Sequence, residues 1–85
     1  MADTFQIQIA TPEKLVLDTQ AQSAQIPGLD GYMGILPGHA ALLSELGAGQ
    51  LSVTAVGGKT QDFQISGGYV EVRDNHVRVL ADIAE

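Results

Sequence analysis

The chain has 85 residues, a formal net charge of −6 at pH 7, 45% hydrophobic residues and no cysteine. This length suffices for one small hydrophobic core, so we expect residues 1–85 to form a single domain. The lack of cysteine excludes a disulfide framework and cysteine-ligated zinc, and the acidic balance argues against a nucleic-acid partner, whose phosphates would be repelled.

The N-terminal part of the chain carries short extended patterns. Residues 5–9 alternate apolar side chains with glutamines, which is the period-2 pattern of a half-buried strand. A turn at residues 11–14 precedes a second extended run at residues 15–17. A weaker strand is predicted at residues 21–26, because a Pro-Gly pair then ends the pattern.

Residues 27–49 do not fit this regular pattern. They combine several leucines with glycines that are spread along the whole segment. Long loops without structure are uncommon in small domains and are often functional. Two interpretations therefore stay open, a functional loop or further short strands that feed the core, and both can hold together.

The second half of the chain predicts a hairpin. Residues 51–55 alternate, and Gly57-Gly58 is typical of a two-residue hairpin turn that leads into a returning strand at residues 63–72. The Ser-Gly-Gly triplet at residues 66–68 interrupts that strand, as a bulge or a close backbone contact would.

A turn at residues 73–75 and a final alternating strand at residues 77–81 complete the pattern. Short strands at this spacing, joined by glycine-rich turns, are typical of a β-sandwich or a flattened barrel. The sequence therefore predicts an all-β fold.

The residues offer little catalytic or metal-binding chemistry. No serine lies in a G-x-S-x-G elbow, and the two histidines, His39 and His76, are far apart in the sequence. Metal-binding His-x-x-x-His spacing and clustered carboxylate pairs are also missing from the sequence. We expect no catalytic residue, no cofactor and no metal site.

Lys59 supports an alternative function, because it follows the predicted hairpin turn. Lipoyl and biotinyl carrier domains are flattened barrels of similar length that carry a modified lysine on an exposed hairpin. Their lysine is flanked by Asp and Ala or by two methionines, whereas Gly58 and Thr60 flank Lys59, so this alternative is disfavoured. A sugar- or peptide-recognition sandwich is a further option, but only two tyrosines and two phenylalanines are available as an aromatic platform.

The segment GYMGILPGHA at residues 31–40, followed by two leucines, resembles the G-x-x-G-I-x-P-G-H-A-P-L-L segment of the F-type ATP synthase epsilon-subunit family. Residues 66–72 and 77–82 agree with two more blocks of that family. Residues 5–13 resemble its first strand and turn. The resemblance covers essentially the whole chain.

The resemblance implies a ten-stranded β-sandwich on the central-stalk rotor of the ATP synthase. In that family the domain binds the gamma subunit on one side and rests on the polar loops of the membrane c-ring on the other. The resemblance therefore implies a domain that is not catalytic and that couples proton-driven rotation to ATP synthesis.

The same resemblance suggests contact residues. The c-ring contact is expected at the following positions: Gly31, Tyr32, Met33, Pro37, Gly38 and His39. The gamma contact is expected near Thr11 and Ser44. Tyr32 departs from the family, which often has an acidic residue there, and Ala41 replaces a usual proline. His39 has an alternative role, in which its ring only closes its own turn.

Family members commonly continue into a two-helix hairpin that inhibits ATP hydrolysis and in some relatives binds ATP. This sequence stops at Glu85, so we expect coupling without inhibition and without nucleotide binding. The sequence has no apolar run long enough to span a membrane and no signal sequence. We expect a peripheral protein without membrane insertion at the cytoplasmic face of a bacterial inner membrane, or its organellar equivalent.

Overall fold

The computed structural model describes residues 3–85, and its regular elements are all β-strands. The strands are β1 (Phe5–Ala10), β2 (Leu15–Gly28), β3 (Gly31–Ile35), β4 (Leu42–Glu45), β5 (Ala48–Ala55), β6 (Thr60–Arg73) and β7 (His76–Ala84). The predicted all-β fold is confirmed. Within residues 3–85, the structure contains no helix with the length and apolar character needed to cross a membrane.

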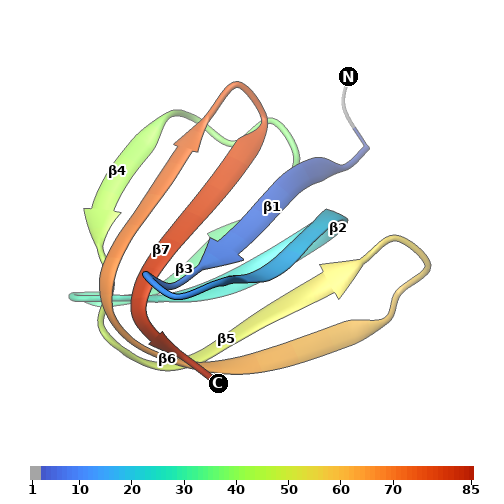
Figure 1. The fold of residues 1–85 in the computed structure, drawn as a ribbon. Helices are drawn as coiled ribbons and strands as arrows, with labels where there is room; N and C mark the ends of the chain where they lie inside the picture. The colour runs from blue at the N-terminus through green and yellow to red at the C-terminus, as the bar shows by residue number, and fades with distance from the viewer. Residues whose placement is uncertain (1–2) are drawn as a thin grey trace.

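The strands close into a flattened barrel. Neighbouring strands follow the order β1-β7-β6-β5-β2, and β2 pairs again with β1, which closes the ring. Strand β3 adds to β2 and strand β4 adds to β6 outside this ring. Figure 1 shows these strands wrapped around one interior, with β6 curving from the lower right to the upper left.

Residues 3–85 form seven strands where the resemblance implied ten, and two of these seven are long and serve both layers of the sandwich, which accounts for two of the three strands of difference. The first half of β2 pairs with β1, and its second half pairs with β5 and β3. In the same way, the first half of β6 pairs with β5, and its second half pairs with β4 and β7.

Strand β6 turns the corner between the layers at Gly67 and Gly68. Their φ angles are 72° and 109°, in a region that residues with a side chain rarely adopt. A Cβ at Gly68 would lie 2.0 Å from the carbonyl oxygen of Leu80, so β7 approaches the bare backbone here. The β6–β7 register runs through the corner without a shift, so the interruption is the expected close backbone contact and not a bulge.

The core consists of the inward side chains of the alternating strands. Phe5, Ile7 and Ile9 are at most 1% exposed, while the glutamines between them are half-buried, as the sequence predicts. The remaining buried apolar residues are Ala21, Ala24, Ile26, Ile35, Leu46, Leu51, Val53, Ile65, Val70, Val72, Val77, Val79 and Ala81.

Two turns refine the sequence interpretation. The predicted two-residue turn between β5 and β6 is wrong, because the N–H of Ala55 donates to the carbonyl of Lys59 at 2.8 Å and leaves residues 56–58 as a three-residue loop. The β6–β7 turn has two residues, Asp74 and Asn75, with φ angles of 52° and 62°. Two successive positive φ angles are typical of the type I′ hairpin turn.

Residues 27–49 contain the predicted short strands that feed the core, together with a connecting loop. Strands β3 and β4 lie within this segment, and Ile35 and Leu46 belong to the buried core. A loop at residues 36–41 joins the two strands. The segment is therefore two short strands and a connecting loop.

Candidate interaction surfaces

The segment expected at the c-ring runs along β3 and the loop that follows it. Gly31 begins β3, and Pro37, Gly38 and His39 lie in the β3–β4 loop. A strand rises about 3.3 Å per residue, so Gly31 and Pro37 lie roughly 20 Å apart. The structure therefore places these residues at the two ends of β3 and not in one cluster.

Tyr32 lies across the neighbouring strands. Its hydroxyl accepts a hydrogen bond from the backbone N–H of Gln50 at 2.9 Å. The ring covers Gly49, where a Cβ would lie 2.5 Å from the Tyr32 hydroxyl oxygen and 3.1 Å from Pro27. Because the hydroxyl is occupied within the chain, a partner at Tyr32 would meet the outer face of the ring. Tyr32 as a residue is 58% exposed.

Met33 differs from its neighbours on β3. Its side chain is half-buried and packs against the hydrophobic core. Its Cε would lie 3.2 Å from a Cβ built on Gly28, at the end of β2. Met33 is thus placed to support β3 from within the sandwich.

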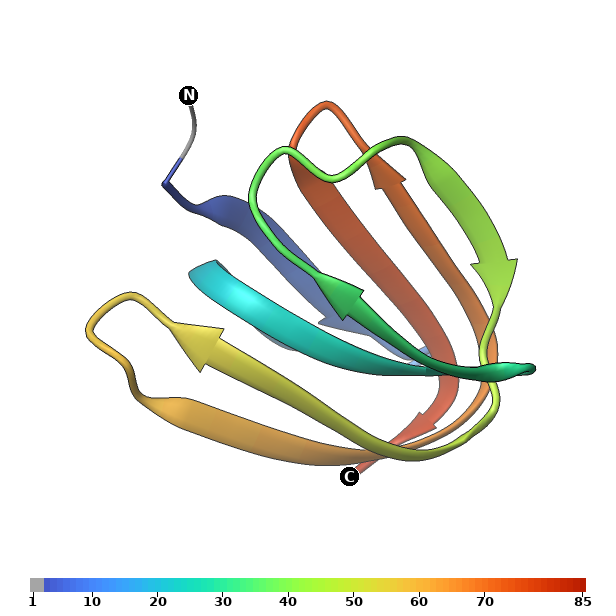
Figure 2. The ribbon, with the colours of Figure 1, turned by 180° about the vertical axis from the view of Figure 1, so that it is seen from behind.

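The loop after β3 begins with a tight turn. The N–H of His39 donates to the carbonyl of Leu36 at 3.1 Å, and Gly38 has a φ of 81°. Proline at the second position and positive φ at the third are typical of a type II turn. Figure 2 shows this green loop rising beside the orange-red β6–β7 turn, where the N–H of Gly38 donates to Asn75 Oδ1 at 2.9 Å.

The ring of His39 is exposed and stays close to its own backbone. Its Nδ1 lies 2.7 Å from the carbonyl oxygen of Ala40, so Nδ1 is the donor of this contact. The ring thus contacts its own loop, while the turn itself is closed by the backbone bond from His39 to Leu36. The contact with Ala40 leaves Nε2 at the surface, where a partner could reach it.

A second surface, which we call the outer apolar face, lies on the outside of β1, β2, β4, β6 and β7. The register places Tyr69 beside Leu80, Leu80 beside Ala10, and Ala10 beside Leu15. Tyr69, Leu80 and Leu15 are 52–56% exposed, and Leu43 on β4 is 72% exposed. Large apolar side chains gathered on one exposed face of a small protein indicate an interaction surface.

A groove of about 570 Å³ crosses the outer apolar face above the glycine corner of β6. Thr11 lines this groove, with Glu45 and Asp82 among the other lining residues. The Thr11 hydroxyl accepts from the N–H of Lys14 at 3.3 Å, which orders the β1–β2 turn at the edge of the groove. The groove therefore combines an apolar floor with carboxylates.

The structure does not bring Ser44 to this groove. Ser44 pairs with Val70, whose side chain is fully buried, so Ser44 faces the inner side of β4. Its neighbours Leu43 and Glu45 face outward instead. Thr11 and Ser44 thus lie on opposite sides of the sheet.

Sequence reasoning did not identify Leu43, Tyr69 and Leu80 as surface residues for a partner. The signal was present in β6 and β7, where Tyr69 directly precedes the core residue Val70 and Leu80 lies between the core residues Val79 and Ala81, so both must face outward. An apolar residue at an outward position is informative only when its neighbours across the sheet are known, and the register supplies that information.

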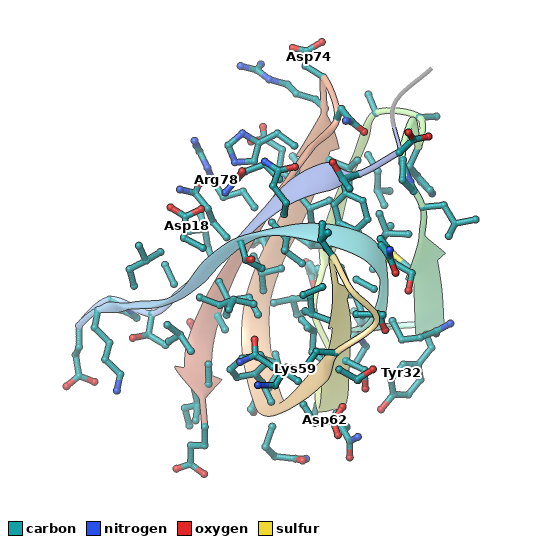
Figure 3. All side chains as sticks on the ribbon, turned by 90° about the vertical axis from the view of Figure 1, so that its right-hand side faces the viewer. Asp18, Tyr32, Lys59, Asp62, Asp74 and Arg78 are labelled. Atoms are coloured by element: carbon teal, nitrogen blue, oxygen red, sulfur yellow. The ribbon has the colours of Figure 1, made fainter. Side chains whose placement is uncertain are left out.

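A polar region borders the outer apolar face toward the β6–β7 turn. The following charged or polar residues surround a cleft of about 170 Å³: Glu71, Arg73, Asp74, His76 and Arg78. The Nε2 of His76 lies 3.1 Å from Gln8 Oε1, and Gln8 Nε2 donates to Asp18 at 3.4 Å. Figure 3 shows Asp18 and Arg78 on the side of the barrel opposite Tyr32.

No group of three or more His, Cys, Asp or Glu side chains that could hold a metal ion is found in the described part of the chain, residues 3–85. Lys59 is exposed directly after the β5–β6 loop, as the carrier-domain alternative requires.

Comparison with known proteins identifies a family and several relatives of this chain. Residues 4–85 match the family described as the ATP synthase Delta/Epsilon chain, beta-sandwich domain. The chain is 47% identical over its full length to the ATP synthase epsilon chain of Solibacter usitatus and 48% identical to that of Koribacter versatilis, covering 63% and 59% of those proteins. It thus spans about three-fifths of the length of these relatives.

Solved structures agree with this result. The whole chain superposes on 54% of a chain in the Euglena gracilis mitochondrial ATP synthase, described as OSCP/F1/c-ring, with a TM-score of 0.93 and 26% identity. A chain in the central stalk/c-ring of the Tetrahymena thermophila enzyme gives a TM-score of 0.78 at 22% identity over 94% of this chain and 64% of that one, which shows the same fold. The carrier-domain alternative is not favoured by these findings.

Proposed function

Because the chain belongs to the family of ATP synthase delta/epsilon β-sandwich domains, we propose that it is a non-catalytic part of the central-stalk rotor of an F-type ATP synthase. In this role it couples the gamma subunit to the c-ring during proton-driven ATP synthesis. The observation that carries the proposal is the family match over residues 4–85, nearly the whole chain.

The outer apolar face is the surface that we assign to the gamma subunit. Burial of Tyr69, Leu80, Leu15 and Leu43 would remove their exposed apolar area from water, which is the main source of affinity between protein surfaces. Thr11 lies at the edge of the groove on this face. We place the gamma contact at Thr11, Leu43 and Tyr69 rather than at Ser44.

The β3 segment and the loop after it are the surface that we assign to the c-ring. Gly31 and the ring of Tyr32 lie at one end, and Pro37, Gly38 and His39 lie at the other. Because the two ends are roughly 20 Å apart, the ring would contact this edge at two points. Two separated contacts resist tilting better than one.

The closed barrel explains how such a part would transmit torque. A ring of hydrogen-bonded strands has each of its members paired on both sides, so a force applied at β3 reaches β6 and β7 through paired backbone and a packed core. This role requires stiffness and two surfaces, and it requires no reaction. We therefore infer a peripheral position, at the cytoplasmic face of a bacterial membrane or its organellar equivalent, set by the partners and not by insertion.

Binding to purified gamma subunit tests the gamma surface. We expect the double variant Tyr69→Ser, Leu80→Ser to weaken binding at least about tenfold, because aromatic and aliphatic anchors dominate such interfaces. The matched control is Val56→Ser, which changes a 57% exposed apolar residue on the distant β5–β6 loop. Equal binding by all three proteins would refute this assignment.

A further inference from the structure

Asn75 joins three segments that are far apart in the sequence. Its Nδ2 donates to the carbonyl of Thr4 at 2.6 Å, and its Oδ1 accepts from the N–H of Gly38 at 2.9 Å. Its own carbonyl accepts from the N–H of Gln6 at 3.2 Å. One residue of the β6–β7 turn thus holds the start of β1 and the β3–β4 loop together.

The bond to Gly38 matters because the loop makes few hydrogen bonds to the rest of the chain. Within residues 3–85, it is the one hydrogen bond recorded between residues 36–41 and another part of the chain. The other bonds of this loop, from His39 to Leu36 and Ala40, are internal. They set the shape of the turn but not its direction relative to the barrel.

The geometry of Asn75 suits this task. Its φ of 62° lies in the left-handed region, which asparagine tolerates better than most residues. The half-buried amide can donate and accept at once, so it bonds both the carbonyl of Thr4 and the N–H of Gly38. A carboxylate could serve only the N–H, and a glycine could serve neither.

We propose that Asn75 is a positioning residue that fixes the direction of the Pro37–Gly38–His39 turn before a partner binds. The consequence for binding rests on the proposed contact of this turn with the c-ring. A turn that is already oriented does not lose freedom when it binds, so affinity is higher than for a free loop.

Amide hydrogen exchange in the isolated chain tests the positioning itself. In Asn75→Gly, which keeps the positive φ but removes the amide, we expect the Gly38 amide to exchange roughly tenfold faster. In Asn75→Asp, which keeps an acceptor for Gly38, we expect protection close to that of the original chain. The matched control Asp74→Gly alters the other residue of the same turn and should leave Gly38 unchanged. Unchanged Gly38 exchange in Asn75→Gly, or equal loss in Asp74→Gly, would overturn the proposal.

Binding to a purified gamma–c-ring complex tests the consequence. We expect Asn75→Gly to bind about 3–10-fold more weakly and Asn75→Asp to recover most of the affinity, with the thermal midpoints of the two variants alike. Faster Gly38 exchange without any loss of affinity would overturn the link between the turn and the ring. If the original chain does not bind the complex, the proposed function fails, while the exchange result still decides the role of Asn75.

Discussion

Two tyrosines of similar exposure differ in their contacts within the chain. Tyr32 is 58% exposed and Tyr69 is 54% exposed. Tyr32 lies over Gly49 and accepts a backbone hydrogen bond from Gln50, so it covers the outside of the sandwich. Within residues 3–85, no hydrogen bond is recorded for the Tyr69 hydroxyl, which leaves the whole ring for a partner. Exposure alone does not distinguish a side chain with a structural contact from one that is free to meet a partner.

Removing single hydroxyls tests this difference. We expect Tyr32→Phe to lower the free energy of unfolding by about 0.5–1.5 kcal/mol, because the N–H of Gln50 loses its acceptor. The Gln50 amide should also exchange faster. The matched control Tyr69→Phe should change stability by less than about 0.5 kcal/mol. Urea unfolding followed by circular dichroism measures both, and an equal effect of the two changes would contradict the assignment.

At the scale of elements, the corner of β6 decides how the sandwich is built. Strands β4 and β5 pair with β6 on either side of Gly67 and Gly68, and the same residue offset holds for both pairings. Strands β4 and β5 therefore run beside β6 in the same register, and the pairing is interrupted only at the corner. The close approach of the Leu80 carbonyl requires a residue without a side chain at this point.

Glycine substitutions separate backbone conformation from close contact. In Gly57→Ala, the new Cβ meets open space at a φ of 95°, so only conformational strain of about 1–2 kcal/mol is expected. In Gly68→Ala, the same kind of strain is joined by a collision with the backbone of Leu80 at 2.0 Å. We expect its loss of stability to exceed that of Gly57→Ala by about 1–3 kcal/mol or more. Thermal unfolding compares the two, and similar midpoints would show that β7 can move away.

At the scale of the whole molecule, strand β1 completes the ring. It pairs with β2 on one side and, in parallel, with β7 on the other. Its apolar side chains are part of the single buried cluster. Damage to β1 should therefore loosen the entire barrel and not one edge.

Truncation of Ile7 tests this cooperativity. Ile7 is fully buried, so we expect Ile7→Val to cost about 0.5–1.5 kcal/mol and Ile7→Ala about 2–5 kcal/mol. For a domain of this size, each kcal/mol lowers the thermal midpoint by roughly 4–8 °C. Leu29→Ala, at a 64% exposed turn position, should have little effect. If hydrogen exchange showed that Ile7→Val loosens only β1, the barrel would not be one cooperative unit.

The sequence by itself determined the strand class and the inward residues. Alternation at residues 5–9 and 77–81 places apolar side chains on one face, and this depends only on the two-residue repeat of a strand. The segment at residues 31–40 also sufficed to identify the family, because its glycine, proline and histidine positions are specific. These are local properties, so neighbouring residues suffice to read them.

Only the tertiary structure decided which residues meet. Gly38 and Asn75 are 37 residues apart, and the outer apolar face joins residues from β1, β2, β4, β6 and β7. The pairing of β4 with β6 also turned Ser44 away from the groove. Which strands pair depends on how the whole core packs. A long strand such as β2 or β6 pairs with different partners along its two halves. No local pattern contains that information.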